Sequence, residues 1–455
     1  MTTFVFDHAL LPEGWARDVR IEVAGGMIAR VQCDETDRQS AQHIAGIAVP
    51  GLPNLHCHSF QRAMAGLAER RGPANDSFWT WREVMYGFLG ALTPDDVEAI
   101  AAFAYMEMLE AGFAAVGEFH YLHHDTAGRP YADIGEMAAR IVAAAARTGI
   151  GLTLLPSFYA NGGFGGLPGM PGQRRFLNDV DAFVRVVART REIASVLPDT
   201  VVGIAPHSLR AVTPETLRLV LDAFPSGPVH IHAAEQTKEV DDCIAALGAR
   251  PVAWLLDHHE VGPRWCPVHA THMDEAETAR LARSGAVAGL CPLTEANLGD
   301  GIFNGVEFVS AGGRFGVGSD SNIQIDAAGE LRQLEYAQRL RHRARNVLAG
   351  HEGQSTGRRL YDGALAGGAQ ALGRALGAIA PGRRADIVVL DAGHPDLAGR
   401  RADAWLDAYV FVGGRSLVRT VLVGGERVIE NGRHRQHEAI TEQYRTVSTR
   451  LLHAS

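Results

Sequence analysis

The sequence predicts an α/β protein built as a (β/α)8 TIM barrel, with a β-sandwich domain formed by both chain ends. Three observations lead to this fold class. Eight apolar, β-rich runs alternate with helical stretches through the middle of the chain, short strand-like segments occupy both ends, and polar side chains close four of the eight runs. We expect the β-sandwich domain to comprise 1–48 and 375–455, and the barrel to comprise 49–374.

The composition is typical of a large folded protein. The chain has 455 residues, 46% of them hydrophobic and 21% charged, which is enough for a large core and too long for one compact unit of average size. The formal net charge is −9 and there is no long basic run, which argues against nucleic acid and membrane surfaces as partners.

Several features indicate a cytoplasmic protein. Residues 1–7 lack the basic and apolar regions of a signal peptide, and no stretch is apolar for long enough to span a bilayer. The 5 cysteines form no CxxC pair and have no disulfide-framework spacing. We therefore expect reduced thiols and a cytoplasmic location.

Short β-rich segments occur at both ends of the chain, three at each end. They are separated by turns that contain glycine or proline, and neither end has enough strands for a stable sheet of its own. We therefore expect the two ends to pair with each other. The segments are 4–6, 19–23, 27–31, 385–390, 417–423 and 426–430.

The middle of the chain alternates apolar runs with Ala- and Leu-rich helical stretches such as 94–111, 136–148 and 179–197. Eight βα units close a barrel of parallel strands, whose active site lies at the carboxyl ends of the strands. A doubly wound open sheet is the alternative, but it gives no reason for polar groups at the ends of the first, fifth, sixth and eighth runs together. The runs are 47–56, 114–120, 151–157, 201–206, 229–232, 266–271, 286–291 and 314–320.

Four of the polar residues have the character of metal ligands. His56 and His58 stand two positions apart, so in a strand their imidazoles point the same way and can converge on one ion. His232 closes the fifth run, and His230 is a rival ligand of the same strand parity that lies farther from the strand end. Asp320 closes the eighth run. Three imidazoles and one carboxylate suit Zn²⁺ or Fe²⁺ and leave a position for water, whose pKa the ion would lower to about 7.

Two further residues are candidates for proton transfer. Glu235 lies three residues after His232, where its carboxyl group could protonate a leaving nitrogen; the alternative is a carboxylate that stabilises the start of a helix. His269 closes the sixth run and could orient the water or polarise a substrate; the alternative is a hydrogen-bonded core histidine. Asp320 could take a proton from the bound water.

With these residues in place, the chain resembles the amidohydrolase superfamily over essentially its whole length, in the branch of guanine deaminase, cytosine deaminase and chlorohydrolase relatives. The resemblance rests on the split terminal domain, the His56 and His58 pair, His232, His269, Asp320 and the closing segment 381–388. Two-metal members carry a carboxylated lysine on the fourth strand, and the fourth run, 201–208, has no lysine. The resemblance therefore implies one divalent ion per subunit, with Zn²⁺ favoured over Fe²⁺.

Within that branch the chain is most similar to the formimidoylglutamate deiminases. The supporting stretches are 56–66, 118–124, 205–210 and 291–301, and the last, which contains Thr-Glu-Ala-Asn-Leu-Gly-Asp-Gly, is the most specific. The resemblance implies hydrolysis of N-formimidoyl-L-glutamate to N-formyl-L-glutamate and ammonia, in histidine degradation. Asp320 and His269 would then manage the proton of the attacking water, and Glu235 would protonate the departing nitrogen.

The implied substrate is a small dicarboxylate, whose two carboxylates call for arginine forks near the barrel mouth. Arg210, just past the fourth run, is the best candidate, and the next are Gln61, Tyr121, His207 and Arg82. The alternative for Arg82 is a surface helix residue paired with Glu83. A homodimer is the usual expectation for this family, so Arg82 could reach either its own site or that of a neighbouring subunit.

Two other functions stay open. An aromatic-base deaminase of the same fold would need a pocket that stacks a ring, and Arg210 with polar groups in place of aromatic walls argues against it. A metal-binding, non-catalytic scaffold is disfavoured by the intact set of His, Glu and Asp residues. The Gly-rich stretch 162–169 is either a lid over the substrate or a plain flexible loop.

Overall fold

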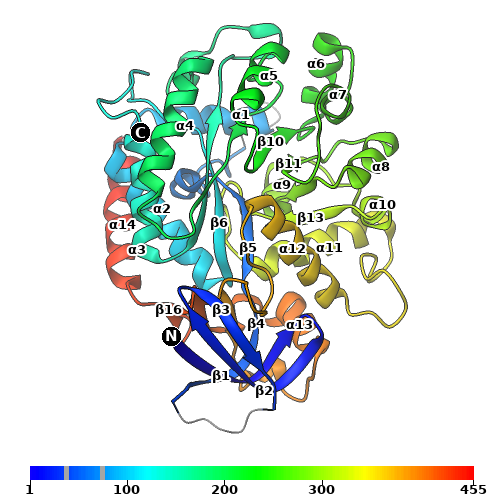
Figure 1. Ribbon diagram of the computed structural model, residues 1–455. Coiled ribbons are helices and arrows are strands. Elements are labelled where there is room, and N and C mark those ends of the chain that lie inside the picture. Colours follow the sequence, from blue (N-terminus) through cyan, green and yellow to red (C-terminus); the bar gives the residue numbers. More distant parts are fainter. Residues whose placement is uncertain (35–39, 72–76, 455) are drawn as a thin grey trace.

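The computed structural model describes residues 1–34, 40–71 and 77–454 (Figure 1). The two chain ends share one eight-stranded sheet in the order β17-β16-β15-β14-β4-β1-β2-β3. The predicted pairing of the ends is confirmed, because β14 runs antiparallel to β4 with Ile387 opposite Pro50. The strands are β1 (Thr2–Leu11), β2 (Gly14–Ala24), β3 (Met27–Gln32), β4 (Gln42–Pro50), β14 (Ile387–Leu390), β15 (Val418–Val423), β16 (Glu426–Glu430) and β17 (Arg433–His434).

The rest of the strands form two parallel sheets, as expected for βα units. Their residues are buried along nearly their whole length, which explains why they read as continuous apolar runs rather than as alternating ones. One sheet contains β5 (Leu52–Cys57), β6 (Phe113–His120), β7 (Gly151–Phe158) and β8 (Val201–Val202), with β9 (Ala205–Pro206) also paired to β7. The other contains β10 (Val229–Ala233), β11 (Trp265–His269), β12 (Val287–Leu290) and β13 (Arg314–Val317).

Isolated parallel bridges join these two sheets at both of their edges. Cys57 pairs with Asp320, which links β5 to the segment after β13. Ile204 pairs with Val229, and Ser208 with His232, which link the β9 region to β10. Strand β5 therefore lies beside the segment after β13, and β10 lies beside the β9 region.

Two predicted runs are each divided in the structure. The first run, 47–56, is not one strand: the chain leaves β4 at Pro50, turns at Gly51 and begins β5 at Leu52. A Cβ at Gly51 would lie 2.5 Å from the Cβ of Ala114, so only glycine fits the turn. The fourth run is divided into β8 and β9 at Gly203, where a Cβ would lie 2.5 Å from the carbonyl oxygen of Pro228.

Helices follow the parallel strands along the chain. None in the described part of the chain is long and apolar enough to cross a membrane. They are α1 (Phe78–Leu89), α2 (Pro94–Glu110), α3 (Glu136–Thr148), α4 (Val180–Ala194), α5 (Pro214–Ala223), α6 (Thr237–Leu247), α7 (Pro251–His258), α8 (Glu275–Ser284), α9 (Pro292–Leu298), α10 (Gly305–Ser310), α11 (Ala327–His342), α12 (Thr356–Leu372), α13 (Asp403–Ala408) and α14 (His437–Ala454). Shorter turns include η1 (Ser59–Met64), η2 (Phe164–Gly166), η3 (Pro171–Gln173), η4 (Pro395–Leu397), η5 (Tyr409–Gly413) and η6 (Gly414–Leu417).

The last residues of the chain are helical, although the sequence predicted a β-rich C-terminal part. Helix α14 lies along α2 (Figure 1), where the ring of Tyr444 stacks on Phe103 at a centroid distance of 3.9 Å. Arg450 also forms an ion pair with Asp96 in the first turn of α2. The C-terminal end therefore packs on a helix of the parallel part as well as in the terminal sheet.

Candidate active site and metal centre

The four predicted metal ligands lie together at the carboxyl ends of three strands. The Nε2 atom of His56 is 3.2 Å from Nε2 of His232 and 3.3 Å from Oδ1 of Asp320. The Nε2 atom of His58 is 3.4 Å from the same carboxylate oxygen. One donor atom from each residue falls within 4.8 Å of all the others, and all four residues are buried. We call these four residues the ligand quartet.

The backbone brings Asp320 to this place. It lies three residues beyond the end of β13, in a left-handed conformation with φ of 44°. Its N–H donates to the carbonyl of His56 and its carbonyl accepts from the N–H of His58, both at 3.0 Å. These two bonds fix the carboxylate beside the two histidines of β5.

The hydrogen bonds of the rings fit a cation at the centre of the quartet. The Nδ1 atom of His58 donates to the carbonyl of Phe119 at 2.9 Å, and that of His232 donates to the carbonyl of His207 at 3.0 Å. A carbonyl only accepts, so both Nε2 atoms present lone pairs, that of His58 toward the carboxylate of Asp320 and that of His232 toward Nε2 of His56. Burial also lowers the pKa of His56 to about 3 and that of His232 well below its usual value, which keeps the imidazoles neutral. Neutral imidazoles and a carboxylate in this arrangement suit a divalent metal ion.

His230, the rival ligand, lies outside the quartet. Its Nε2 atom bonds to the carbonyl of Ala371 at 2.8 Å, although the residue is buried on the same strand as His232.

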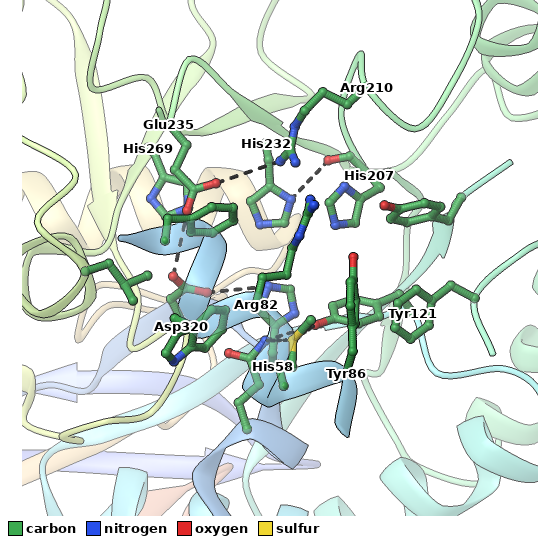
Figure 2. A pocket seen from close by; sticks show the side chains of 17 residues that line it. His58, Arg82, Tyr86, Tyr121, His207, Arg210, His232, Glu235, His269 and Asp320 are labelled. Atoms are coloured by element: carbon green, nitrogen blue, oxygen red, sulfur yellow. Dashed lines mark hydrogen bonds and ion pairs between the residues drawn. The ribbon is translucent and has the colours of Figure 1, made fainter. Parts of the chain in front are cut away.

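Glu235 and His269 lie beside the quartet, as Figure 2 shows. The Nε2 atom of His269 is 3.8 Å from Oε1 of Glu235 and 3.9 Å from Oδ2 of Asp320. Burial raises the pKa of Glu235 to about 7. Burial disfavours the charged form of His269, but the carboxylates of Glu235, Glu295 and Asp320 outweigh this and raise its pKa to about 10.

The alternative role of Glu235, a carboxylate that stabilises the start of a helix, does not match this geometry. Glu239 is the carboxylate near the start of α6, where it accepts from the N–H groups of Ala234 and Glu235. The carboxylate of Glu235 instead faces His269. His269 is buried, but one ring nitrogen is directed to Glu295 and the other to the cavity.

One cavity of about 540 Å³ opens above the quartet. All five predicted substrate-binding residues line it: Gln61, Arg82, Tyr121, His207 and Arg210. Arg82 and Arg210 enter it from different elements, α1 and the segment after β9 (Figure 2). Arg82 lines the cavity of its own chain, and no ion pair joins it to Glu83 in the part of the chain that the structure describes.

The two arginines differ in their surroundings. The Arg82 guanidinium lies over the rings of Trp79 and Tyr86, at 4.6 and 5.5 Å from the centroids. Arg210 lies 5.7 Å from the centroid of Trp79, and its Nη2 is 4.0 Å from Glu235. The Nε–H of each arginine is buried without a hydrogen-bond partner among the described residues.

The expectation of a cavity without aromatic walls is wrong. Its lining includes six aromatic side chains besides the histidines, Phe78, Trp81, Tyr86, Tyr121, Tyr159 and Phe176. Sequence reasoning identified only Tyr121 among them. The density of aromatic residues in 78–86, next to Arg82, is the signal that could have identified α1 as part of the cavity.

Comparison with known proteins agrees with this site. The family described as "Amidohydrolase family" matches residues 47–428, and "Formimidoylglutamate deiminase HutF, N-terminal domain" matches residues 2–40. The chain is 52% identical to the formimidoylglutamate deiminase of Pseudomonas aeruginosa, covering 99% of this chain and 100% of that protein. It is 28% identical to a 5-methylthioadenosine/S-adenosylhomocysteine deaminase of Natronomonas pharaonis, covering 85% of this chain and 82% of the relative.

A solved structure extends the likeness to the whole fold. The crystal structure of an amidohydrolase from Brucella melitensis superposes with a TM-score of 0.95 at 52% identity, covering 99% of this chain and 100% of that one. The chain therefore belongs to the amidohydrolase family and, within it, to the formimidoylglutamate deiminases.

Proposed function

We propose that the chain hydrolyses N-formimidoyl-L-glutamate to N-formyl-L-glutamate and ammonia, as a step of histidine degradation. The observation that carries the proposal is a single cavity with the ligand quartet on one side and two arginines with unpartnered Nε–H groups on the other. The full-length similarity to the Pseudomonas aeruginosa formimidoylglutamate deiminase supports the choice of substrate.

The ligand quartet would hold one divalent ion, which we take to be Zn²⁺ because three imidazoles and a carboxylate suit it, with Fe²⁺ as the alternative. Such an ion lowers the pKa of a water molecule to about 7 and so supplies a nucleophile at neutral pH. One ion is proposed because β8 and β9, the fourth run of the sequence, carry no lysine.

The chain's own groups would move the protons. Asp320 takes up the proton of the attacking water, and His269, whose Nε2 atom lies 3.9 Å from Oδ2 of Asp320, orients that water. Glu235, whose pKa burial raises to about 7, can hold a proton at neutral pH and deliver it to the nitrogen that leaves as ammonia.

The wall of the cavity would bind the two carboxylates of the substrate. The planar guanidinium groups of Arg82 and Arg210 can each bind a carboxylate through two parallel N–H donors. Gln61, Tyr121 and His207 would complete the polar contacts. Gln61 donates to the hydroxyl of Tyr121 at 2.9 Å, and its Oε1 atom is buried without a partner among the described residues.

We also propose that the two parallel sheets close into a (β/α)8 barrel. The parallel bridges from Cys57 to Asp320 and from Ile204 to Val229 support closure at both seams. Residues 49–374 would be the catalytic barrel, and 1–48 with 375–455 the β-sandwich domain. The subunits would form a cytoplasmic homodimer.

A deaminase of purine or pyrimidine rings is the second candidate, favoured by the aromatic lining of the cavity. Ammonia release from N-formimidoyl-L-glutamate by metal-replete enzyme, with guanine, cytosine and S-adenosylhomocysteine in parallel, separates the two. Turnover of N-formimidoyl-L-glutamate alone is the expected result. Turnover of a ring substrate with none of N-formimidoyl-L-glutamate would refute the proposal.

A further inference from the structure

The most specific motif of the sequence, Thr-Glu-Ala-Asn-Leu-Gly-Asp-Gly at 294–301, lies directly behind the proton-transfer residues. It forms most of α9 and the turn that follows, which begins with Gly299 at φ of 70°. Leu298 of this motif lines the cavity, whereas Glu295 does not. The function proposed above leaves the motif without a role.

This motif contacts all three proton-transfer residues: His269 directly, and Asp320 and Glu235 through residues next to them in sequence. The hydroxyl of Thr294 lies 3.2 Å from the carbonyl of Ser319 and 3.0 Å from the hydroxyl of Ser321, the two residues that flank Asp320. Asp300 accepts a hydrogen bond from the side chain of Gln236, which follows Glu235. The contact to His269 is direct and comes from Glu295.

Glu295 fixes the direction of the His269 ring. Its Oε1 atom is 3.3 Å from Nδ1 of His269 and accepts from the N–H of Cys291 at 2.8 Å. A carboxylate at this nitrogen favours the proton on Nδ1, which directs Nε2 toward Glu235 and Asp320. The ring needs such support because the backbones of His269 and Ala270, at the end of β11, both adopt the left-handed conformation, with φ of 67° and 50°.

We propose that Glu295 is a positioning residue for the proposed hydrolysis and acts only through His269. It holds the Nδ1–H so that Nε2 faces the reacting atoms, and it touches neither the substrate nor the ligand quartet. The inference rests on the proposed function, in which His269 orients the attacking water. The alternative is a structural role, in which Glu295 only accepts the hydrogen bond from the N–H of Cys291.

A double-mutant cycle with His269 separates these two roles. Glu295→Gln should lower kcat by about tenfold to a hundredfold, with KM and bound metal close to wild type. In the His269→Asn background the same substitution should cost no further activity, because the ring that it positions is gone. Equal losses of kcat in both backgrounds, or no loss in the wild-type background, would overturn the proposal.

A matched control shows what the loss of a buried structural carboxylate does. Glu335 of α11 is fully buried and accepts from the N–H groups of Val347 and Leu348 at 3.0 and 3.1 Å. Glu335→Gln should lower the Tm and leave kcat unchanged. If Glu295→Gln does not fold, Glu295→Asp keeps the charge and should retain a kcat between those of wild type and His269→Asn; a kcat at the His269→Asn level would contradict the proposal.

A measurement without substrate keeps this proposal separate from the proposed function. In metal-loaded wild type, the Nδ1–H of His269 should give a downfield, exchange-protected proton resonance, assigned by its loss in His269→Asn. Glu295→Gln should shift or remove this signal, and Glu335→Gln should leave it. An unchanged signal in Glu295→Gln would overturn the positioning role even if N-formimidoyl-L-glutamate is not the substrate.

Discussion

The floor and the wall of the cavity are built from different kinds of element. The floor is the ligand quartet with His269, and its residues lie in, or within three residues of, parallel strands. The wall is α1 with the segment after β9, and it presents Arg82 and Arg210 between aromatic rings. The wall therefore comes from a helix and a loop, and the floor from strand ends.

The two regions also differ in how their polar groups are satisfied. In the floor, the second ring nitrogens of His58, His232 and His269 each have a partner among the neighbouring carbonyl or carboxylate groups, whereas Nδ1 of His56 has none among the described residues. In the wall, the Nε–H groups of both arginines are buried without one among the described residues. A floor in which neighbouring groups hold three of the four imidazoles suits chemistry, and a wall with free donors suits binding. We therefore expect floor substitutions to lower kcat and wall substitutions to raise KM.

Removal of the ion should have the largest effect of all. Without the ion, no group of the floor would lower the pKa of a water molecule enough to supply hydroxide at neutral pH. Dialysis against a chelator should abolish ammonia release, and stoichiometric Zn²⁺ should restore it. Full turnover in a sample shown to be metal-free by elemental analysis would contradict the account.

Substitution of the proton-transfer groups should come next. Asp320→Asn and His269→Asn should each lower kcat by about a hundredfold to ten-thousandfold, the usual contribution of a general acid or base. Circular dichroism and metal analysis test whether the fold and the ion are retained. His230→Asn is the matched control, since it removes a buried histidine of β10 that lies outside the quartet. Near-normal kcat in His269→Asn would exclude its proposed role.

Loss of an arginine of the wall should act mainly on KM. Arg210→Ala should raise KM by about tenfold or more without loss of metal, because a carboxylate of the substrate loses its charged partner. Arg210→Lys should recover only part of the loss, since an ammonium cannot form a two-pronged contact. Arg218→Ala, at an exposed arginine of α5 paired with Asp222, is the control. An unchanged KM in Arg210→Ala would remove it from the carboxylate site.

The smallest effect is expected at Trp79, a residue that sequence reasoning did not identify. Its ring lies under Arg82 and beside Arg210, so Trp79→Leu should loosen both guanidinium groups and raise KM about two- to fivefold. Val84→Ala, at an exposed position of the same helix, should change neither kcat nor KM. Identical KM values for both variants would show that the rings do not hold the arginines.

The difference between floor and wall also explains which residues of the site could be predicted from the sequence. Parallel strands bring their carboxyl ends to one edge, so His56, His232 and Asp320 could be placed together from their positions at the ends of apolar runs. The aromatic wall could not be placed by the same rule, because the segment 78–86 does not directly follow any predicted run; only its density of aromatic residues marks it in the sequence. The proposed role of Glu295 depends on its contact with Nδ1 of His269, which no residue pattern reveals.

In the proposed division, the floor performs the chemistry while the wall holds the two carboxylates. The most direct test is a crystal structure of the Zn²⁺-loaded His269→Asn variant with N-formimidoyl-L-glutamate bound. We expect the formimidoyl carbon beside the ligand quartet and the two carboxylates within hydrogen-bond distance of Arg82 and Arg210. A substrate bound the other way round, with a carboxylate on the quartet and neither arginine engaged, would contradict it.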